Sequence, residues 1–468
     1  MTDSEAAATR MERDSMGEMA VPVDALYGAS TQRAVLNFPI SGRRFPRRFL
    51  AALALVKLAA AETNAELGLL EPPVAEAIAA VAREVADGAH DDQFPIDIYQ
   101  TGSGTSTNTN MNEVLATLAT RRLGRTVHPN DAVNRCQSSN DTIPTALQLS
   151  AAMAIEGDLL PALERLHTAL VAKEQELWPV VKTGRTHLQD ATPIRLGQEF
   201  RGYAGQVEES LRRARAAQAE LLSVPLGGTA VGTGINAHHE FAFRTCARLS
   251  SLTGLAVRET SNHFHAQATL DAAIAAHGAI RTIALSLWKI ASDVRLMGMG
   301  PRAGLAELAL PETQPGSSIM PGKVNPVIVE SLTMVVARVV GNDASVAFGQ
   351  TGSFLELNVM LPVTAAAMLE SIELLAAAAD NFSVRCIEGL TATDRGPALV
   401  EQGLMLATAL APAIGYDAAA ALAKDAFKSG RTIRELALER GMDPAELDRL
   451  LDPAAMTEPG LGGGPAGG

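Results

Sequence analysis

The amino-acid sequence predicts an all-α fold of three domains, organised around a central bundle of long helices. Apolar residues recur every three or four positions over several long stretches, whereas the alternation of apolar and polar residues that marks β-strands is scarce. Only 4% of the 468 residues are aromatic and alanine is abundant, so the helices can pack closely with small side chains between them. Five long helical patterns in the middle of one chain indicate a helical bundle.

The helices are expected in the following order. The N-terminal domain, residues 1–138, carries shorter helices near 49–67 and 73–87. The central domain, residues 139–390, carries long helices at about 142–180, from 196 onward, and at about 264–297, 326–348 and 361–385. The C-terminal domain, residues 391–468, carries short helices around 417–428 and 432–440. Its last residues, 459–468, are mostly glycine and proline, and we expect them to be disordered.

Several of the long helices carry apolar residues on more than one face. Val335, Val336, Val339 and Val340 are an example. A monomer would expose such surface to water, so we expect burial between subunits in a closed symmetric oligomer. The alternative is a large monomeric bundle.

The charge of the chain and the distribution of its apolar residues exclude several classes of protein. The chain has 39 basic and 52 acidic residues, so its net charge of −13 does not fit binding to nucleic acid or to an anionic membrane surface. No uninterrupted apolar stretch approaches the ~20 residues that span a bilayer, and residues 1–14 do not resemble a signal segment. We therefore expect a cytoplasmic protein.

No metal site is expected either. Cys136, Cys246 and Cys386 are far apart in the sequence and form no Cys-x-x-Cys pair, which disfavours a disulfide framework, a zinc module or an iron–sulfur cluster. His263 and His265 have no third ligand at helical spacing, so solvated or capping histidines fit better.

A long loop between about residues 298 and 326 is rich in proline and glycine and predicts a lid over a binding site. Within it, the segment from Gly316 combines two serines, Lys323 and an amide just before a helix expected near Pro326. Flexible backbone N–H groups, the positive end of a helix and a lysine together suit an anion. The alternative is an ordinary loop.

Three other polar clusters interrupt the apolar pattern, and each is expected to precede a helix. They are residues 101–112, residues 128–131 with 138–141, and residues 184–187. Each one alone also fits helix caps and turns. Together they predict a polar pocket where several helix ends meet.

These segments resemble those of a known family. Gly316-Ser-Ser-Ile-Met-Pro-Gly-Lys-Val-Asn-Pro326 is similar to the shared motif of the aspartase/fumarase superfamily. Further stretches resemble class II fumarases, and the resemblance covers residues 13–456. They are Asp14-Ser-Met-Gly-Glu18, Thr31-Gln-Arg33 with Asn37-Phe-Pro-Ile40, Gln100-Thr-Gly-Ser-Gly-Thr105, His128-Pro-Asn-Asp131, Gln137-Ser-Ser-Asn-Asp141 and Gly184-Arg-Thr-His187.

The resemblance implies reversible hydration of fumarate to L-malate, a step of the tricarboxylic acid cycle, with no cofactor. It implies a homotetramer with a superhelical helical core, in which each active site takes residues from three subunits. It also implies that Ser317 removes the C3 proton of malate and that His187, held by Glu330, assists the departing hydroxyl group.

The remaining site residues are likewise implied by the resemblance. The substrate-binding residues are Ser103, Gly104, Thr105, Ser138, Ser139, Asn140, Thr186, Ser318, Lys323, Val324 and Asn325. A second anion site matches Arg125, His128, Pro129, Asn130 and Asp131.

Two other functions remain as alternatives. An aspartate ammonia-lyase shares the lid motif, but the aspartase pattern has glutamine at His187, asparagine at His128 and threonine at Ser139. A non-catalytic scaffold with the same fold would be expected to lose Ser317, His187, Lys323 or Glu330, and all four are present. Departures from the expected pattern at Tyr27 and Ser30 concern N-terminal packing, and Gly403 stands where a serine is common, a departure that concerns the C-terminal domain and not the reaction.

Overall fold

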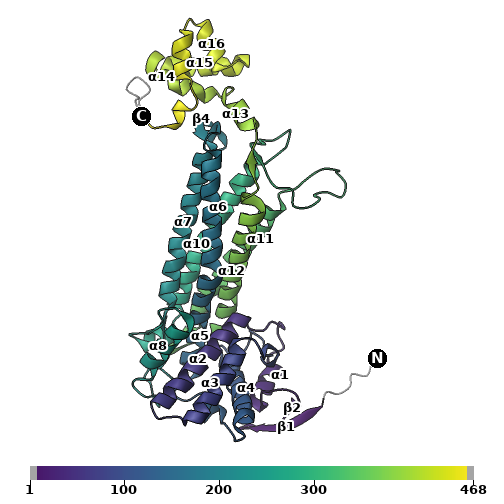
Figure 1. The fold of residues 1–468 in the computed structure, drawn as a ribbon, viewed down its shortest axis with the longest axis vertical. Coiled ribbons are helices and arrows are strands. Elements are labelled where there is room, and N and C mark those ends of the chain that lie inside the picture. The colour runs from purple at the N-terminus through teal and green to yellow at the C-terminus, as the bar shows by residue number, and fades with distance from the viewer. Residues whose placement is uncertain (1–7, 461–468) are drawn as a thin grey trace. The chain divides into compact units, whose positions relative to one another are not determined.

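The computed structural model describes residues 8–460 and confirms a mainly helical protein (Figure 1). The chain forms two compact units, each built from three separate segments. Within the described range, unit 1 comprises residues 8–161, 212–284 and 335–377, and unit 2 comprises residues 162–211, 285–334 and 378–460. The division into three contiguous domains stays a prediction.

Unit 1 is built around a buried helix, α2 (Arg47–Glu66), in which 14 of 20 residues are buried. Such burial explains why α2 is apolar almost all round rather than along one stripe. The other named elements that lie wholly in unit 1 are β1 (Thr9–Asp14), β2 (Gly17–Pro22), α1 (Ala29–Asn37), α3 (Pro72–Ala86), α4 (Thr105–Leu123), α5 (Ser139–Ala154), β5 (Ser223–Val224), α8 (Phe241–Thr253), β6 (Arg258–Glu259), α9 (His263–Ala268), β8 (Ser353–Phe354) and β9 (Leu357–Asn358).

Unit 2 contains the hairpin of β3 (Val181–Thr186) and β4 (Gln189–Arg195), and the pair of β7 (Leu308–Ala309) with β10 (Thr391–Ala392). Its short C-terminal helices are α13 (Arg395–Val400), α14 (Ala407–Ile414), α15 (Tyr416–Ser429), α16 (Ile433–Glu439) and α17 (Pro444–Leu450). These helices share a core that includes Leu410, Leu422, Ile433 and Leu447.

The long helices match most of the predicted ranges, and their residues are divided between the units. They are α6 (Leu160–Leu177), α7 (Leu196–Leu221), α10 (Asp271–Met297), α11 (Val327–Gly349) and α12 (Leu361–Phe382). The predicted stretch 142–180 is helical as expected, because a π-helical turn, Ile155–Leu159, joins α5 to α6. By length and composition, residues Leu361–Ile387 suffice to cross a membrane, but 67% of the apolar window is buried, as in a core helix.

One predicted helix, at about 264–297, is wrong as a single element. The structure ends α9 at Ala268 and begins α10 at Asp271, with extended backbone at Thr269 (φ −125°, ψ 166°). The N–H of Leu270 donates to Oε1 of Gln350 at 2.9 Å, so a distant side chain satisfies a backbone group at the break. The apolar spacing continues across this break, which is why the pattern did not reveal it.

Strand-like patterns are scarce in the sequence, and they did not reveal the five two-stranded sheets that the structure has within residues 8–460. Most have only two residues per strand. The β3–β4 hairpin matters most, because it carries one of the polar clusters that we expected directly before a helix. Of the predicted disordered tail, residues 461–468 lie outside the described part of the chain.

Candidate active site

The first group of candidate residues lies in unit 1, where the N-termini of α4 and α5 meet. The hydroxyl oxygen of Thr105 lies 2.7 Å from that of Ser103 and 2.7 Å from that of Ser139. Asn140 donates from Nδ2 to the carbonyl oxygen of Ala230 at 2.9 Å. The structure therefore brings together polar groups from both helices, as the sequence predicted.

Gly104 allows the N-terminus of α4 to approach α5 closely. It caps α4 in the left-handed conformation (φ +70°), and a Cβ there would lie 2.7 Å from Cγ2 of Ile143 on α5. Glycine avoids both the conformational strain and the clash. The polar segment 101–112 does not simply precede the helix as expected, because α4 already begins at Thr105.

Ser138 and Asp141 fix the start of α5 through a capping box. Oδ2 of Asp141 also accepts hydrogen bonds from the N–H groups of Gly227 (3.0 Å) and Thr229 (2.9 Å). Burial raises the pKa of Asp141, while these N–H donors oppose the rise. Ser138 is thus a helix cap, as the alternative reading of this segment predicted. Asp141 of the same capping box also anchors the loop at Gly227–Thr229.

The candidate second anion site is an exposed turn after α4. Nδ1 of His128 accepts from the N–H groups of Asn130 (3.2 Å) and Asp131 (3.1 Å) and caps the π-helical turn Pro129–Val133. Arg125 forms an ion pair with Glu71 at 2.5 Å. Arg125 and His128 are both exposed, so each remains accessible to an anion in this chain.

The second group of candidate residues lies in unit 2. Thr186 ends β3, and His187 with Leu188 forms the two-residue turn to β4. Both turn residues have positive φ, at 55° and 57°. Such backbone costs a non-glycine residue roughly 1–2 kcal/mol. His187 is exposed, so it is not a buried histidine bonded to a carbonyl.

The lid segment folds back on itself. Oγ of Ser317 accepts from the N–H groups of Ile319 (3.3 Å) and Met320 (2.9 Å). Nδ2 of Asn325 donates to the Gly316 carbonyl oxygen at 2.6 Å, and a Cβ on Gly316 would collide with the carbonyl of Lys323. The two ends of the segment 316–325 therefore lie against each other. Within it, the hydroxyl oxygen of Ser317 accepts two backbone N–H groups.

The side chains of His187, Lys323 and Glu330 form no hydrogen bond or ion pair within residues 8–460. Ser318, Lys323 and Val324 are exposed on the loop, and Glu330 is exposed in the first turn of α11. The expected contact between His187 and Glu330 is not made inside this chain and stays a prediction. No group of three or more His, Cys, Asp or Glu side chains in the same range is arranged to hold a metal ion.

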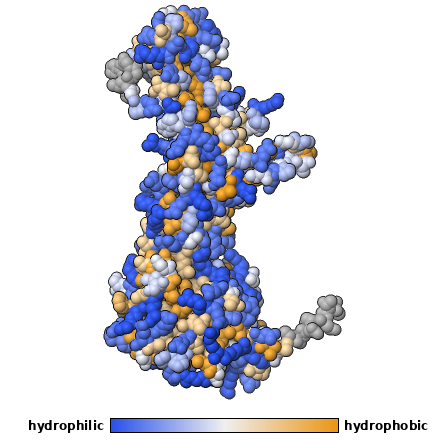
Figure 2. Space-filling model, in the orientation of Figure 1, coloured by the Kyte–Doolittle hydropathy of each residue, from blue (hydrophilic) through white to orange (hydrophobic). Residues whose placement is uncertain are grey.

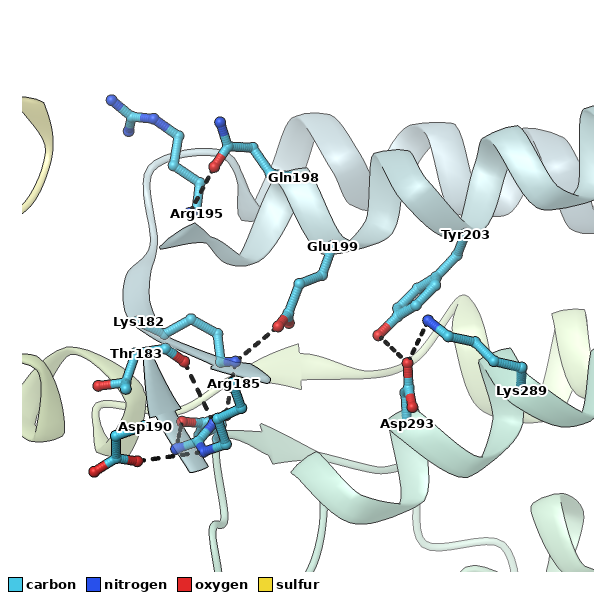
Figure 3. Close-up of polar contacts among 11 residues, drawn as sticks. Lys182, Thr183, Arg185, Asp190, Arg195, Gln198, Glu199, Tyr203, Lys289 and Asp293 are labelled. Atoms are coloured by element: carbon cyan, nitrogen blue, oxygen red, sulfur yellow. Dashed lines mark hydrogen bonds and ion pairs between the residues drawn. The ribbon is translucent and has the colours of Figure 1, made fainter. Parts of the chain in front are cut away.

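One cluster of charged residues was missed by the sequence reasoning. Lys182 of β3 forms ion pairs with Glu199 of α7 (Figure 3) and with Glu307, just before β7. Arg185 of β3 pairs with Glu307 as well. The only signal in the sequence was Arg185, which lies inside the polar segment 184–187. Its partner Glu307 is 122 residues away, and no pattern in the sequence around Glu307 indicates that it is paired.

The chain is similar to known proteins over nearly its whole length. The "Lyase" family model matches residues 17–341, and the "Fumarase C C-terminus" model matches residues 406–458. The chain is 52% identical over 463 residues to a class II fumarate hydratase of Mycobacterium tuberculosis, covering 97% of this chain and 98% of that protein. It is 51% identical over 459 residues to one of Methylorubrum extorquens, covering 96% and 97%.

A crystal structure of the class II fumarase of Schistosoma mansoni superposes with a TM-score of 0.94. The two sequences are 38% identical, and the match covers 96% of this chain and 99% of the other. Sequence, fold and both parts of the family pattern agree over nearly the whole length. The chain therefore belongs to the class II fumarase (fumarate hydratase) family.

Proposed function

We propose that this chain catalyses the reversible addition of water to fumarate to give L-malate, as the hydro-lyase EC 4.2.1.2 of the tricarboxylic acid cycle. The observation that carries the proposal is 52% identity to a class II fumarate hydratase across 97% of the chain. The polar groups at the starts of α4 and α5, on the β3–β4 turn and on the lid loop supply the chemistry that this reaction needs.

Ser317 acts as the base that removes the C3 proton of malate. A hydroxyl group is a poor base in water, but two N–H donors on its oxygen favour the alkoxide form. The neighbouring carboxylate of the substrate gains negative charge as the proton leaves. Lys323 and Asn325 stabilise that charge, and each preorganised donor contributes ~3 kcal/mol to lowering the barrier.

His187 delivers a proton to the departing hydroxyl group, because imidazole changes its protonation near neutral pH. Glu330 orients it. The hydroxyl and amide groups of Ser103, Thr105, Ser139 and Asn140 bind the substrate carboxylates, assisted by Ser138, Gly104, Thr186, Ser318 and Val324. Arg125, His128, Pro129, Asn130 and Asp131 form a second anion site.

The working enzyme is a homotetramer in which three subunits contribute to each active site. Large apolar side chains are exposed on the long helices of a single chain, among them Trp288 (44%) and Leu285 (46%) on α10 and Met334 (68%) and Phe348 (65%) on α11. Apolar patches are visible between hydrophilic ones in Figure 2. The exposure of these side chains in a single chain supports the tetramer, which would bury them, and the side chains of His187, Lys323 and Glu330, which have no partner within residues 8–460, support shared sites.

The enzyme uses no cofactor, and its proposed location is the cytoplasm. The test is to incubate the purified protein with L-malate and, separately, with L-aspartate, and to follow the ultraviolet absorbance of fumarate. We expect fumarate from malate only. Fumarate from aspartate only would identify an ammonia-lyase, and a correctly folded protein inactive on both would be a scaffold.

A further inference from the structure

A buried cluster of four charged residues lies beneath the turn that carries His187. Nζ of Lys182 lies 2.9 Å from Oε1 of Glu199 and 3.2 Å from Oε2 of Glu307. Arg185 grips Glu307 with two parallel hydrogen bonds, Nη1 to Oε2 at 3.0 Å and Nη2 to Oε1 at 2.8 Å. Figure 3 shows Lys182 of β3 and Glu199 of α7 pointing toward one another.

The cluster is almost closed to water. The side chains of Lys182 and Glu307 are only 2% and 1% exposed, and those of Arg185 and Glu199 are 16% and 20% exposed. Two cations therefore face two carboxylates. Charges are tolerated at such depth only when they are paired, so the four side chains hold one another in a single arrangement.

Glu307 is also fixed through its backbone, at the root of the lid loop. Its N–H donates to the carbonyl of Met297, the last residue of α10, at 2.8 Å. Its carbonyl accepts from the N–H of Thr393, just after β10, at 3.0 Å. The segment that carries Ser317 and Lys323 leaves the folded body shortly after this point.

Arg185 connects Glu307 to the turn that carries His187. It lies two residues before His187, on the strand that ends in a turn with two non-glycine residues at positive φ. A strained turn persists only when its surroundings hold it in place. Arg185 holds this strand end through its bidentate contact with Glu307, at 2.8 and 3.0 Å, whereas its ion pair with the exposed Asp190 is longer, at 3.9 Å.

We propose that Glu307 is a positioning residue for hydration: by gripping Arg185, it holds the His187 turn and the root of the Ser317 loop of its own chain in one rigid frame, which positions each of them for the active site that it enters in the proposed tetramer. This inference rests on the proposed function. Glu307 touches no substrate and acts only through Arg185. A misplacement of about 1 Å can cost 10²-fold in rate, so a loosened frame should lower kcat.

The first test is Glu307→Gln, measured for kcat, KM and thermal unfolding. We expect kcat to fall at least about tenfold, while KM changes less than about threefold, because the backbone bonds at the lid root remain. The variant also leaves Lys182 and Arg185 facing a single buried carboxylate, with only the exposed Asp190 3.9 Å from Arg185, and should lower Tm.

The double variant Lys182→Met/Glu307→Gln separates positioning from charge balance. In the buried cluster it leaves one cation, Arg185, and one carboxylate, Glu199, and Arg185 keeps its 3.9 Å ion pair with the exposed Asp190. We expect Tm to recover toward the wild-type value while kcat stays low. Recovery of kcat together with Tm would overturn the inference, as would a Glu307→Gln enzyme with kcat within twofold of the wild type.

Arg185→Lys provides a test that keeps every charge. Lysine cannot form the two-pronged contact, so kcat should fall about tenfold with little change in Tm. The matched control is Arg195→Lys on β4, whose guanidinium donates to the Trp178 carbonyl at 3.2 Å and does not contact Glu307. Equal kcat values for the two variants would refute the proposal. Absence of malate turnover in the wild type would instead refute the proposed function, and the inference would fall with it.

Discussion

Ser317 is the residue on which the proposed proton removal depends. It is half-buried in the lid loop, and its oxygen already accepts two backbone N–H groups. The hydroxyl of Ser318 is exposed and has neither donor, so two adjacent serines differ in chemical setting. This difference in local hydrogen bonding supports Ser317 rather than Ser318 as the proposed base.

Replacement of Ser317 by alanine should remove the base and leave the fold intact. General-base catalysis contributes typically 10²–10⁴-fold, so we expect kcat for malate dehydration to fall by roughly 10³-fold. Fumarate absorbance measures the rate, and circular dichroism checks the fold. Ser251→Ala, at an exposed position on α8, is the control and should keep full activity. Near-normal turnover by Ser317→Ala would assign the base to another residue.

A second residue, His277, has a structural role. Its Nδ1 lies 2.9 Å from Oδ1 of Asp343, and its Nε2 lies 2.9 Å from Oγ of Ser371. The order serine, histidine, aspartate resembles a hydrolytic triad. However, the residues Ser371 and His277 are both 0% exposed, so no substrate reaches them.

His277 should make stability depend on pH. Burial lowers the pKa of His277 below its usual 6.5, although Asp343 opposes this shift. As pH falls through about 6.5, the unfolded state therefore takes up a proton before the folded state does, and the free energy of unfolding decreases. Thermal unfolding between pH 8 and 5 should show this loss in the wild type. His277→Asn should flatten the profile, whereas His239→Asn, at an exposed position, should not.

At the scale of elements, helix α4 carries a glycine at each end with nearly the same backbone. Gly104 has φ +70° and Gly124 has φ +68°. A Cβ on Gly104 would meet Ile143 at 2.7 Å, whereas a Cβ on Gly124 would meet nothing within 4 Å. One end is packed against α5 at the candidate site, and the other is open.

This pair gives a matched test of how the site is built. Gly124→Ala should cost only the strain of positive φ, about 1 kcal/mol in the free energy of unfolding. Gly104→Ala should cost that strain plus overpacking of 1–3 kcal/mol, and should separate Thr105 from Ser139. Chemical denaturation and malate turnover measure the two effects. Equal loss of activity in both variants would show that the close approach of α4 to α5 is not required.

At the same scale, the sequence predicted helices better than strands. Long periodic stretches such as α11 and α12 were located to within a few residues, because apolar spacing is a local property. The β3–β4 hairpin was missed, because Lys182 and Thr183 are both buried polar residues and alternation is absent. Charge pairing, not an apolar face, holds that strand inside.

At the scale of the whole molecule, each active site of the proposed tetramer takes residues from three subunits, and we infer that Ser317 and His187 of one site come from different subunits. An enzyme lacking Ser317 and one lacking His187 should then complement each other. We expect Ser317→Ala and His187→Asn chains to be nearly inactive alone. After dissociation and random reassembly in equal amounts, about a quarter of the sites should hold both residues intact.

Malate turnover before and after reassembly measures this recovery, and a mixture that is never dissociated is the control. Activity that stays at the level of the separate variants would place both residues of a site on one chain. Sedimentation analysis of the same samples confirms that tetramers have formed again.

The sequence by itself determined the helical class, the position of the lid loop and the segments that bear hydroxyl, amide and histidine groups, since all of these follow from local spacing and composition. Only the tertiary structure decided that the helix pattern breaks at Thr269, that Thr105 meets Ser139, and that Arg185 grips Glu307 122 residues away. Such pairs depend on which surfaces meet after folding. No local pattern encodes them, because a buried charge is recognised only by the partner that neutralises it.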